Sequence, residues 1–162
     1  MYGKARTKKT LIKKLTFDKE TCKVYCENTE GERYAEFPCS FNYWDGYNDR
    51  GERRTPIANG TYPITNEDEN AMEYGHFVGA AYGTFWVALD TVRDRGWHGY
   101  EQGTRRNIDS GTYGCIRSEN EDGEEVCRAI EKAIENGIEV TAEVVGDVDE
   151  YEKFCVGYDG QQ

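Results

Sequence analysis

Histidine, proline and long apolar runs are scarce in this sequence of 162 residues. It holds two His and three Pro, and no apolar stretch approaches the ~18 residues of a membrane-spanning helix. Basic residues are also in the minority, since 20 Lys and Arg stand against 31 Asp and Glu, for a net charge of −11. This balance argues against nucleic acid as the main partner, because phosphate binding requires a cationic surface.

Aromatic residues and glycines are by contrast plentiful. The 12 Tyr, 6 Phe and 3 Trp are too many for a disordered chain of this length, and the 18 Gly indicate many tight turns. The length suits one domain, with room for a tail. We therefore expect a basic N-terminal arm over residues 1–11, a single domain over residues 12–145 and an acidic tail over residues 146–162.

The N-terminal charge is unusual for so acidic a chain. Residues 1–14 carry six basic side chains and no acidic one. Such a segment suits contact with an anionic surface, but we favour a solvated arm that leads into the first strand. No apolar segment follows these charges, so the pattern is not that of a signal peptide. Either the chain is not secreted by that route, or a signal has been removed.

The cysteines do not form a recognisable disulfide or metal pattern. Their density is below that of disulfide scaffolds, and Cys22 and Cys26 on one strand would stand ~13 Å apart, too far for a bridge. There is no CxxC pair, and only His76 and His98 could assist a zinc site. We expect free thiols, no metal and no cofactor. The six are Cys22, Cys26, Cys39, Cys115, Cys127 and Cys155.

Hydrophobic periodicity predicts a mainly β protein with one helix in the C-terminal half. Apolar residues recur with helical spacing from 120 to 136, before a glycine at 137 that suits a helix end. Alternating residues predict strands near 15–17, 22–26, 34–37, 61–64, 84–89 and 138–144. Residues 40–55 and 96–112 are predicted to be mostly loop, the first of them a lid or a plain surface excursion. We expect Trp86 in the core and consider Trp44 for the lid.

His98 and Cys115 are the candidate catalytic residues of this sequence. A thiolate is a strong nucleophile, and a cysteine needs a base or a positive field to form one. His98 could serve as that base if the intervening loop folds back, and Arg117 adds positive charge or could bind a carboxylate. The backbone N–H groups near Gly114 and Cys115 could form an oxyanion hole. Cys115 as an ordinary buried residue stays open as the simpler interpretation.

The order of these residues resembles the active-site signature of L,D-transpeptidase (YkuD-like) catalytic domains. That signature is a His-Gly, a spacer in the middle teens, then Ser/Thr-His-Gly-Cys, an apolar residue and Arg or Asn. Here it reads His98-Gly99, a gap, and Thr112-Tyr113-Gly114-Cys115-Ile116-Arg117. Upstream, Thr55-Pro56 and Gly60-Thr61-Tyr62 resemble the strand entry of the family. The resemblance spans about residues 12–145.

The resemblance implies a mixed, mainly antiparallel β-sandwich and a defined chemistry. Cys115 would attack the carbonyl of a diaminopimelate centre in a peptidoglycan stem peptide, D-Ala would leave, and an amine or water would resolve the thioester. Carbapenems would acylate the same cysteine. By this resemblance, Cys115 is the nucleophile, and His98 is first the base and then the acid. The backbone N–H groups of Gly114 and Cys115 would stabilise the oxyanion, and Arg117 would orient the donor or the motif loop. The residues implied to shape the pocket or contact the substrate are Thr112, Tyr113, Gly99 and Trp97.

Three departures from the family pattern leave alternatives open. Tyr113 replaces the motif His, residues 42–54 form a charged insertion, and the Thr55-Pro56 pair lies farther from Gly60 than is common. The alternatives are a Cys–His peptidoglycan amidase or endopeptidase, and a non-catalytic β-domain that binds the cell wall or a protein. The family implies the cell envelope or periplasm, whereas a phage, effector or processed protein suits the absence of a signal pattern.

Overall fold

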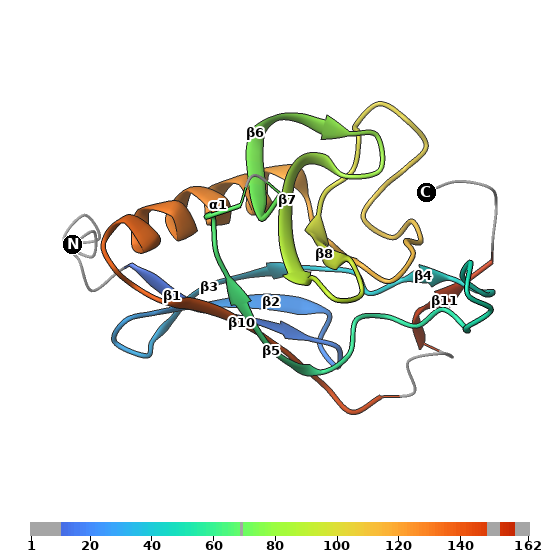
Figure 1. Ribbon diagram of the computed structural model, residues 1–162, viewed down its shortest axis with the longest axis horizontal. Coiled ribbons are helices and arrows are strands. Elements are labelled where there is room, and N and C mark those ends of the chain that lie inside the picture. The colour runs from blue at the N-terminus through green and yellow to red at the C-terminus, as the bar shows by residue number, and fades with distance from the viewer. Residues whose placement is uncertain (1–10, 69, 149–152, 158–162) are drawn as a thin grey trace.

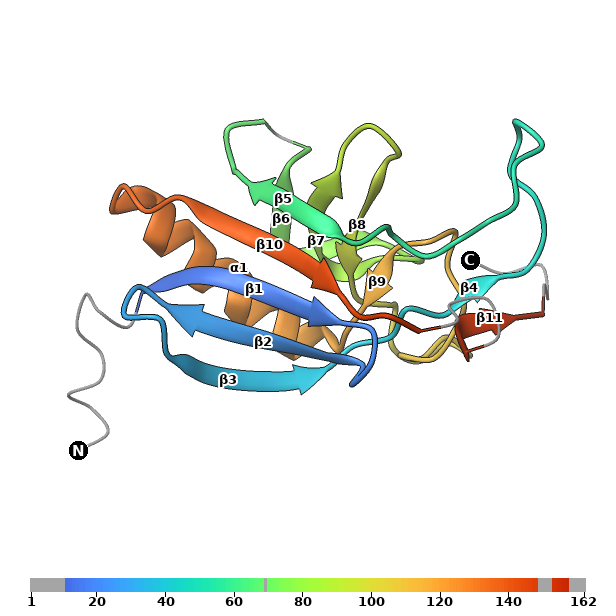
Figure 2. The same cartoon turned by 90° about the horizontal axis from the view of Figure 1, so that it is seen from below.

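The computed structural model describes residues 11–68, 70–148 and 153–157, and these form two packed sheets, a small third sheet and the helix α1 (Figures 1 and 2). The predicted basic arm lies outside the described residues except for Leu11, and so does much of the predicted acidic tail. The elements are β1 (Ile12–Asp18), β2 (Lys23–Asn28), β3 (Arg33–Pro38), β4 (Tyr43–Trp44), β5 (Gly60–Ile64), β6 (Met72–Gly79), β7 (Gly83–Asp90), β8 (Arg95–His98), β9 (Ile116–Arg117), α1 (Asn120–Glu135), β10 (Val140–Val145) and β11 (Cys155–Val156).

The larger sheet has the strand order β3-β2-β1-β10-β5. Only the β1–β10 pair in it is parallel, and the other three pairs are antiparallel. Leu15 and Phe17 alternate with more polar residues along β1 and are fully buried, as strand periodicity predicts. The parallel pair closes the domain, because it brings the C-terminal strand β10 beside the first strand.

The smaller sheet carries the candidate site and has the order β6-β7-β8-β9. Its strands β8 and β9 run parallel. Helix α1 lies beside the smaller sheet, on the same side of the larger sheet: it contacts β1 and β10 of the larger sheet and β6 and β7 of the smaller one (Figures 1 and 2). The buried stripe of the helix, with Val126, Ile130 and Ala133, fills the space between the layers.

The fold-class prediction is confirmed, with differences at the short strands. Helix α1 and strands β1, β7 and β10 lie where periodicity places them. Strand β6 was not predicted, because Met72–Gly79 alternates poorly and is largely exposed. Strand β8 lies partly inside the predicted loop 96–112, because pairing with β7 and β9, rather than local preference, makes those four residues extended.

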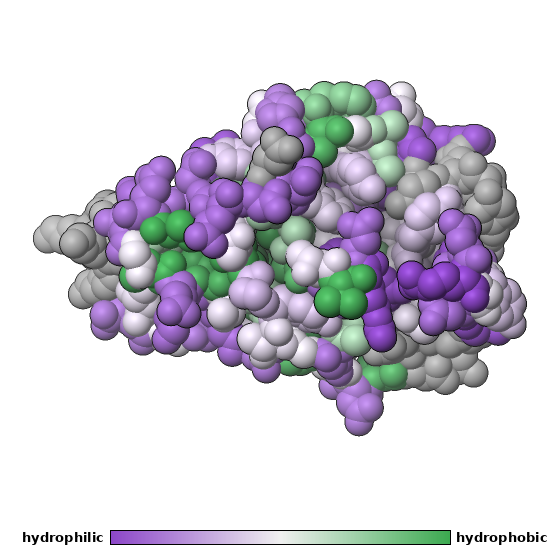
Figure 3. Space-filling view, viewed as in Figure 1, coloured by the Kyte–Doolittle hydropathy of each residue, from purple (hydrophilic) through white to green (hydrophobic). Residues whose placement is uncertain are grey.

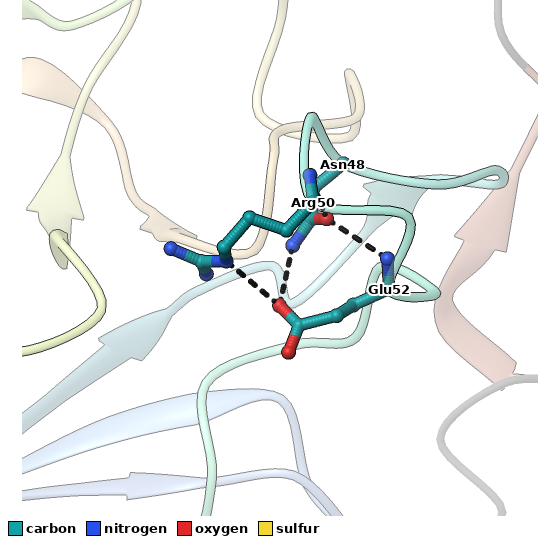
Figure 4. Close-up of polar contacts among 3 residues, drawn as sticks. All are labelled: Asn48, Arg50 and Glu52. Carbon is teal, nitrogen blue, oxygen red and sulfur yellow. Dashed lines mark hydrogen bonds and ion pairs between the residues drawn. The ribbon is translucent and has the colours of Figure 1, made fainter.

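The predicted loop 40–55 contains strand β4 and a tight polar turn. β4 pairs with β11, and Trp44 in β4 is buried rather than exposed on a lid. At the tip, Oδ1 of Asn48 accepts hydrogen bonds from the backbone N–H groups of Arg50 and Glu52. Nδ2 of Asn48 donates a hydrogen bond to the Glu52 carboxylate (Figure 4). These contacts, with the Arg50 guanidinium, hold the pKa of Glu52 below its ordinary value. The loop tip is therefore ordered by its own side chains.

We predict that Gly123→Ala destabilises the protein although alanine favours helices. A Cβ at Gly123 would overlap the Phe85 ring, since the helix backbone passes directly over β7. Overpacking of about 1–3 kcal/mol should outweigh a helix-propensity gain of about 1 kcal/mol. Urea unfolding measures the difference. Glu121→Ala at an exposed position of the same helix is the control, and a Gly123→Ala midpoint at or above the wild-type value contradicts the prediction.

Candidate active site

The parallel β8–β9 pair determines which side chains meet at the site. Trp97 is in register with Ile116, and His98 with Arg117. Side chains in register point to the same face of a sheet, and successive residues alternate between faces. Trp97 and Ile116 are fully buried in the core. His98, Arg117 and, two residues before Arg117, Cys115 therefore share the opposite face.

Cys115 is nearly buried, and its sulfur accepts a hydrogen bond. Only 7% of the residue is exposed, and the Gly96 N–H donates to Sγ at 3.4 Å. Burial raises the pKa of the Cys115 thiol, and Asp94 adds to that rise. The Gly96 N–H and the charges of Arg95 and Arg117 lower the thiol pKa but do not outweigh burial. At rest the sulfur is thus a protonated thiol, with the positive charges of Arg95 and Arg117 and the negative charge of Asp94 nearby.

His98 is fully buried, and one of its nitrogens is held by the backbone. Nδ1 lies 2.8 Å from the Gly99 carbonyl oxygen, which can only accept, so we assign the proton to Nδ1. Nε2 then carries the lone pair, and it has no hydrogen-bond partner among the described residues. Burial first, and the Arg117 charge second, lower the pKa of His98 to about 3. His98 is therefore a neutral base.

Two aromatic side chains enclose the His98 ring and lead to a pocket. Trp86 stacks on it at 6.0 Å between ring centroids, and Tyr82 meets it edge-on at 4.8 Å. Both line a pocket of about 490 Å³ whose wall also includes Arg95 and several carboxylates. Trp86 was predicted to lie in the core, and it lines this pocket instead. The carboxylates belong to Asp68, Glu73, Asp90 and Asp94.

The surface of the protein in the view of Figure 1 is mixed in character, with more hydrophilic than apolar side chains. Figure 3 shows hydrophilic side chains over much of the view, while apolar residues gather over the end of β6 and the turn that follows it, and also between α1 and the larger sheet. Phe77 in β6 is 57% exposed. The acidic pocket wall carries one arginine against four carboxylates, so its field attracts cations.

Arg117 binds backbone carbonyl groups rather than facing solvent. Its guanidinium donates to the carbonyl oxygens of Ala81 and Gly99 at 3.1 Å each, and also to that of Ser110. The side chain is fully buried, and burial lowers the pKa of Arg117 to about 10. The three carbonyls come from the β6–β7 turn, the end of β8 and the loop before the motif. Arg117 therefore links these three segments through its hydrogen bonds.

Thr112 and Gly114 shape the turn that presents Cys115. The Thr112 hydroxyl accepts the Gly114 N–H at 2.9 Å and lies 3.0 Å from the Cys115 carbonyl oxygen. Gly114 has a φ of +130°, and a Cβ there would approach the Thr55 carbonyl oxygen to 2.6 Å and the Arg95 guanidinium carbon to 2.7 Å. Only glycine fits this crowded, left-handed position without a shift.

Tyr113 and Trp97 lie outside the buried centre of the site. Tyr113 is 48% exposed, meets Trp44 edge-on at 5.3 Å and lies under the Arg54 guanidinium at 4.6 Å. Trp97 packs in the core against Phe85 and donates from Nε1 to the Ser118 hydroxyl. Its side chain supports strand β8 from the face opposite His98.

Gly99 connects His98 to the start of helix α1. Its N–H donates to the Tyr82 carbonyl at 2.7 Å, and its own carbonyl accepts from both His98 and Arg117. The Asn120 side chain lies so close to Gly99 that a Cβ would overlap it. Asn120 also donates to the Tyr100 carbonyl, which ties the segment after β8 to the helix.

Arg95, Tyr82 and Trp86 are the site residues that sequence reasoning missed. Arg95 opens strand β8 three residues before His98, and its guanidinium covers Gly114. Burial and the nearby Cys115 raise the pKa of the Tyr82 phenol, which places Tyr82 beside both Cys115 and His98. No sequence pattern indicated Arg95, because the strand that it opens was predicted to be mostly loop. In residues 11–68, 70–148 and 153–157, no group of three or more His, Cys, Asp or Glu is arranged to hold a metal ion, and no helix is long and apolar enough to cross a membrane.

We predict that Arg117→Lys destabilises the protein by about 2–4 kcal/mol. A lysine keeps the charge but cannot reach carbonyls in three directions, and each buried carbonyl left unpaired costs about 1–3 kcal/mol. Denaturant unfolding measures the loss. Arg128→Lys on the exposed face of α1 is the matched control. Equal stability of the wild type and Arg117→Lys would mean that the hydrogen bonds from Arg117 to the three carbonyl groups do not stabilise the protein.

We predict that His98 makes stability depend on pH between about 6.5 and 3. In this interval the unfolded imidazole, with its ordinary pKa of 6.5, binds a proton that the folded protein excludes. The free energy of unfolding therefore falls as pH falls, and His98→Gln should make that decline shallower. Urea midpoints at pH 7 and pH 4.5 measure the slope. His76→Gln controls for loss of an exposed imidazole, and identical slopes in wild type and His98→Gln refute the assignment.

Solved structures, among them an L,D-transpeptidase, share this fold at low sequence identity. The L,D-transpeptidase (Yku) from Stackebrandtia nassauensis has a TM-score of 0.53 at 14% identity, over 85% of this chain and 57% of that chain. The helical cell shape determining protein Pgp2 from Campylobacter jejuni has a TM-score of 0.51 at 17% identity, over 90% of this chain and 53% of that chain. The sequence matches no protein-family model and no curated protein.

The chain thus spans between half and two thirds of the length of these solved chains. The match covers 85% and 90% of this chain, and so extends well beyond the motif residues. The chain has the L,D-transpeptidase (YkuD-type) fold.

Proposed function

We propose that this chain is a cysteine acyltransferase of the L,D-transpeptidase type that acts on peptidoglycan stem peptides. The observation that carries the proposal is the β8–β9 pair, which gives Cys115 and the neutral base His98 the same face of the sheet within this fold. An amine acceptor would give a crosslink or an exchanged D-amino acid. Water would give L,D-carboxypeptidase action. The cell envelope is the compartment where such substrates occur.

In the first half-reaction, the Cys115 sulfur attacks the carbonyl carbon before the terminal D-Ala. The thiol proton moves to Nε2 of His98, whose buried lone pair has no hydrogen-bond partner among the described residues, because Gly99 holds the proton on Nδ1. The carbon–nitrogen bond then breaks, Nε2 gives its proton to the leaving amine, and a thioester remains. Because His98 has a pKa of about 3, proton transfer accompanies attack instead of preceding it.

In the second half-reaction, an acceptor amine attacks the thioester carbonyl. His98 takes a proton from the amine and returns it to the departing sulfur, which restores the thiol. We place the oxyanion at the Cys115 N–H. The Gly114 N–H could join only by exchanging its bond to the Thr112 hydroxyl. Tyr113, half exposed beside the motif turn, is the proposed contact for the rest of the substrate.

The acidic pocket beside the site supports a substrate that carries amines. Its carboxylates face a cavity bounded by Tyr82 and Trp86, the two rings that enclose His98. A cation placed there is attracted by the carboxylates and by the aromatic faces. Stem peptides and free amino acids both offer such ammonium groups.

A non-catalytic peptide-binding domain is the second candidate. The observation that favours it is the burial of Cys115, which leaves the residue only 7% exposed and raises the pKa of its thiol. A Cys–His endopeptidase on the same substrate would cleave without exchanging D-amino acids. One assay separates the three candidates.

We predict exchange of the terminal D-Ala when the protein is incubated with tetrapeptide muropeptides and a free D-amino acid. Mass spectrometry follows the exchanged product. Cys115→Ala should lower turnover by at least about 10³-fold, because no other group forms the thioester. Cys155→Ala, the same change at a half-buried cysteine, is the control and should keep activity.

The other outcomes of this assay redirect the assignment. D-Ala release without exchange indicates a carboxypeptidase that uses the same site. Cleavage elsewhere in the peptide indicates an endopeptidase. Full activity in Cys115→Ala would refute the assignment of Cys115 as nucleophile, and muropeptide binding without any product would favour the binding domain.

A further inference from the structure

Two arginines lie close enough to Cys115 to lower its pKa, and they differ in what else they bind. Arg117 donates from each of its three guanidinium nitrogens to one of the three backbone carbonyls described above. Arg95 makes two contacts through a single terminal nitrogen: Nη1 lies 3.1 Å from the Pro56 carbonyl oxygen and 3.4 Å from the Thr55 hydroxyl. The remainder of its guanidinium lies over Gly114 and borders the 490 Å³ pocket.

The position of Arg95 requires a glycine at position 114, which has no side chain. An added Cβ at Gly114 would lie 2.7 Å from Cζ and 2.8 Å from Nε of Arg95, so the guanidinium rests directly on the glycine backbone. Gly114 precedes Cys115, and the Gly96 N–H, next to Arg95 in the chain, donates to the sulfur. Strand β8 therefore supplies both a backbone donor and a cation to the same region.

His98 does not supply that positive charge. Because it is neutral above a pKa of about 3, no imidazolium stands beside the thiol at rest. The groups that face Cys115 are Arg95 and the Gly96 N–H from β8, Asp94 from the preceding turn, Arg117 from β9 and Tyr82 from the β6–β7 turn. Among these, the two arginines are the cations, and Arg95 is the one that borders the pocket.

We propose that Arg95 is a positioning residue for the reaction, which stabilises negative charge on the Cys115 sulfur and holds the Gly114 turn against Thr55 and Pro56. The proposal rests on the proposed function only in taking Cys115 as the nucleophile. When attack begins, charge builds on the sulfur, and a half-buried guanidinium stabilises that charge more than an exposed one would. When the thioester has formed, the same cation faces the pocket through which the acceptor enters.

The test is the rate of Cys115 alkylation by iodoacetamide as a function of pH. Peptide mass spectrometry follows Cys115 separately from the other cysteines. The midpoint of the profile reports the thiol pKa, whereas a change in access alters only the plateau. Removing a neighbouring opposite charge moves a pKa by about one unit, so Arg95→Gln should raise the midpoint and slow alkylation near neutral pH about tenfold.

Matched variants separate the local charge from other effects. Arg93→Gln removes the same charge at an exposed position two residues away and should keep the wild-type midpoint. Arg95→Lys retains the charge, so its midpoint should lie close to the wild-type value. Arg95→Met is a second neutral variant of similar length, for use if Arg95→Gln does not fold by circular dichroism.

An unchanged midpoint in a folded neutral variant overturns the proposal, and so does an equal shift in Arg93→Gln. Exchange activity in the muropeptide assay is a separate readout. A shifted midpoint in a protein without exchange activity would uphold the role of Arg95 and refute the proposed function. Exchange activity with an unshifted midpoint would do the reverse.

Discussion

The site depends on one buried cation, the guanidinium of Arg117, and its hydrogen bonds to backbone carbonyls. These carbonyls belong to Ala81, Gly99 and Ser110, which lie in three separate segments of the chain. A buried charge is costly unless polar groups surround it, and here carbonyl dipoles fill that role. The Gly99 carbonyl also accepts from His98, so the position of the imidazole and that of the motif loop are coupled through a single oxygen atom.

The same cation sets the electrostatic character of the site. It opposes protonation of His98 and lowers the pKa of the Cys115 thiol, while burial of both groups favours their neutral forms. The resting pair is thus a thiol and a neutral imidazole with an available lone pair. Positive charge comes from arginines, which stay protonated throughout the working pH range. A neutral resting pair is less reactive towards oxidants than a preformed thiolate.

Much of the framework followed from periodicity, and the details of the site did not. The stripe of Val126, Ile130 and Ala133 predicted helix α1 because local spacing determines a helix face. Strand β8 escaped prediction because its four residues include a glycine and a histidine and are extended only through pairing with β7 and β9. Trp86 was assigned to the core because alternation identifies the strand but not which face a pocket occupies.

The motif residues themselves were predicted as a set by their order in the sequence. Their individual positions required the fold: Trp97 faces the core, and Tyr113 is half exposed against Trp44. Arg95 could not be assigned from the sequence, since its contacts with Gly114 and Pro56 join segments about 20 and 40 residues away.

The central claim, that Cys115 is the nucleophile of this site, is tested most directly by acylation with a carbapenem. Attack by the sulfur opens the β-lactam ring, and the ring nitrogen takes up the proton, so the protein gains the whole mass of the compound. Peptide mapping would identify which of the six cysteines carries the adduct. The account predicts a single adduct on Cys115, absent from Cys115→Ala. An adduct confined to the half-buried Cys22 or Cys155, or no adduct at all, would contradict it.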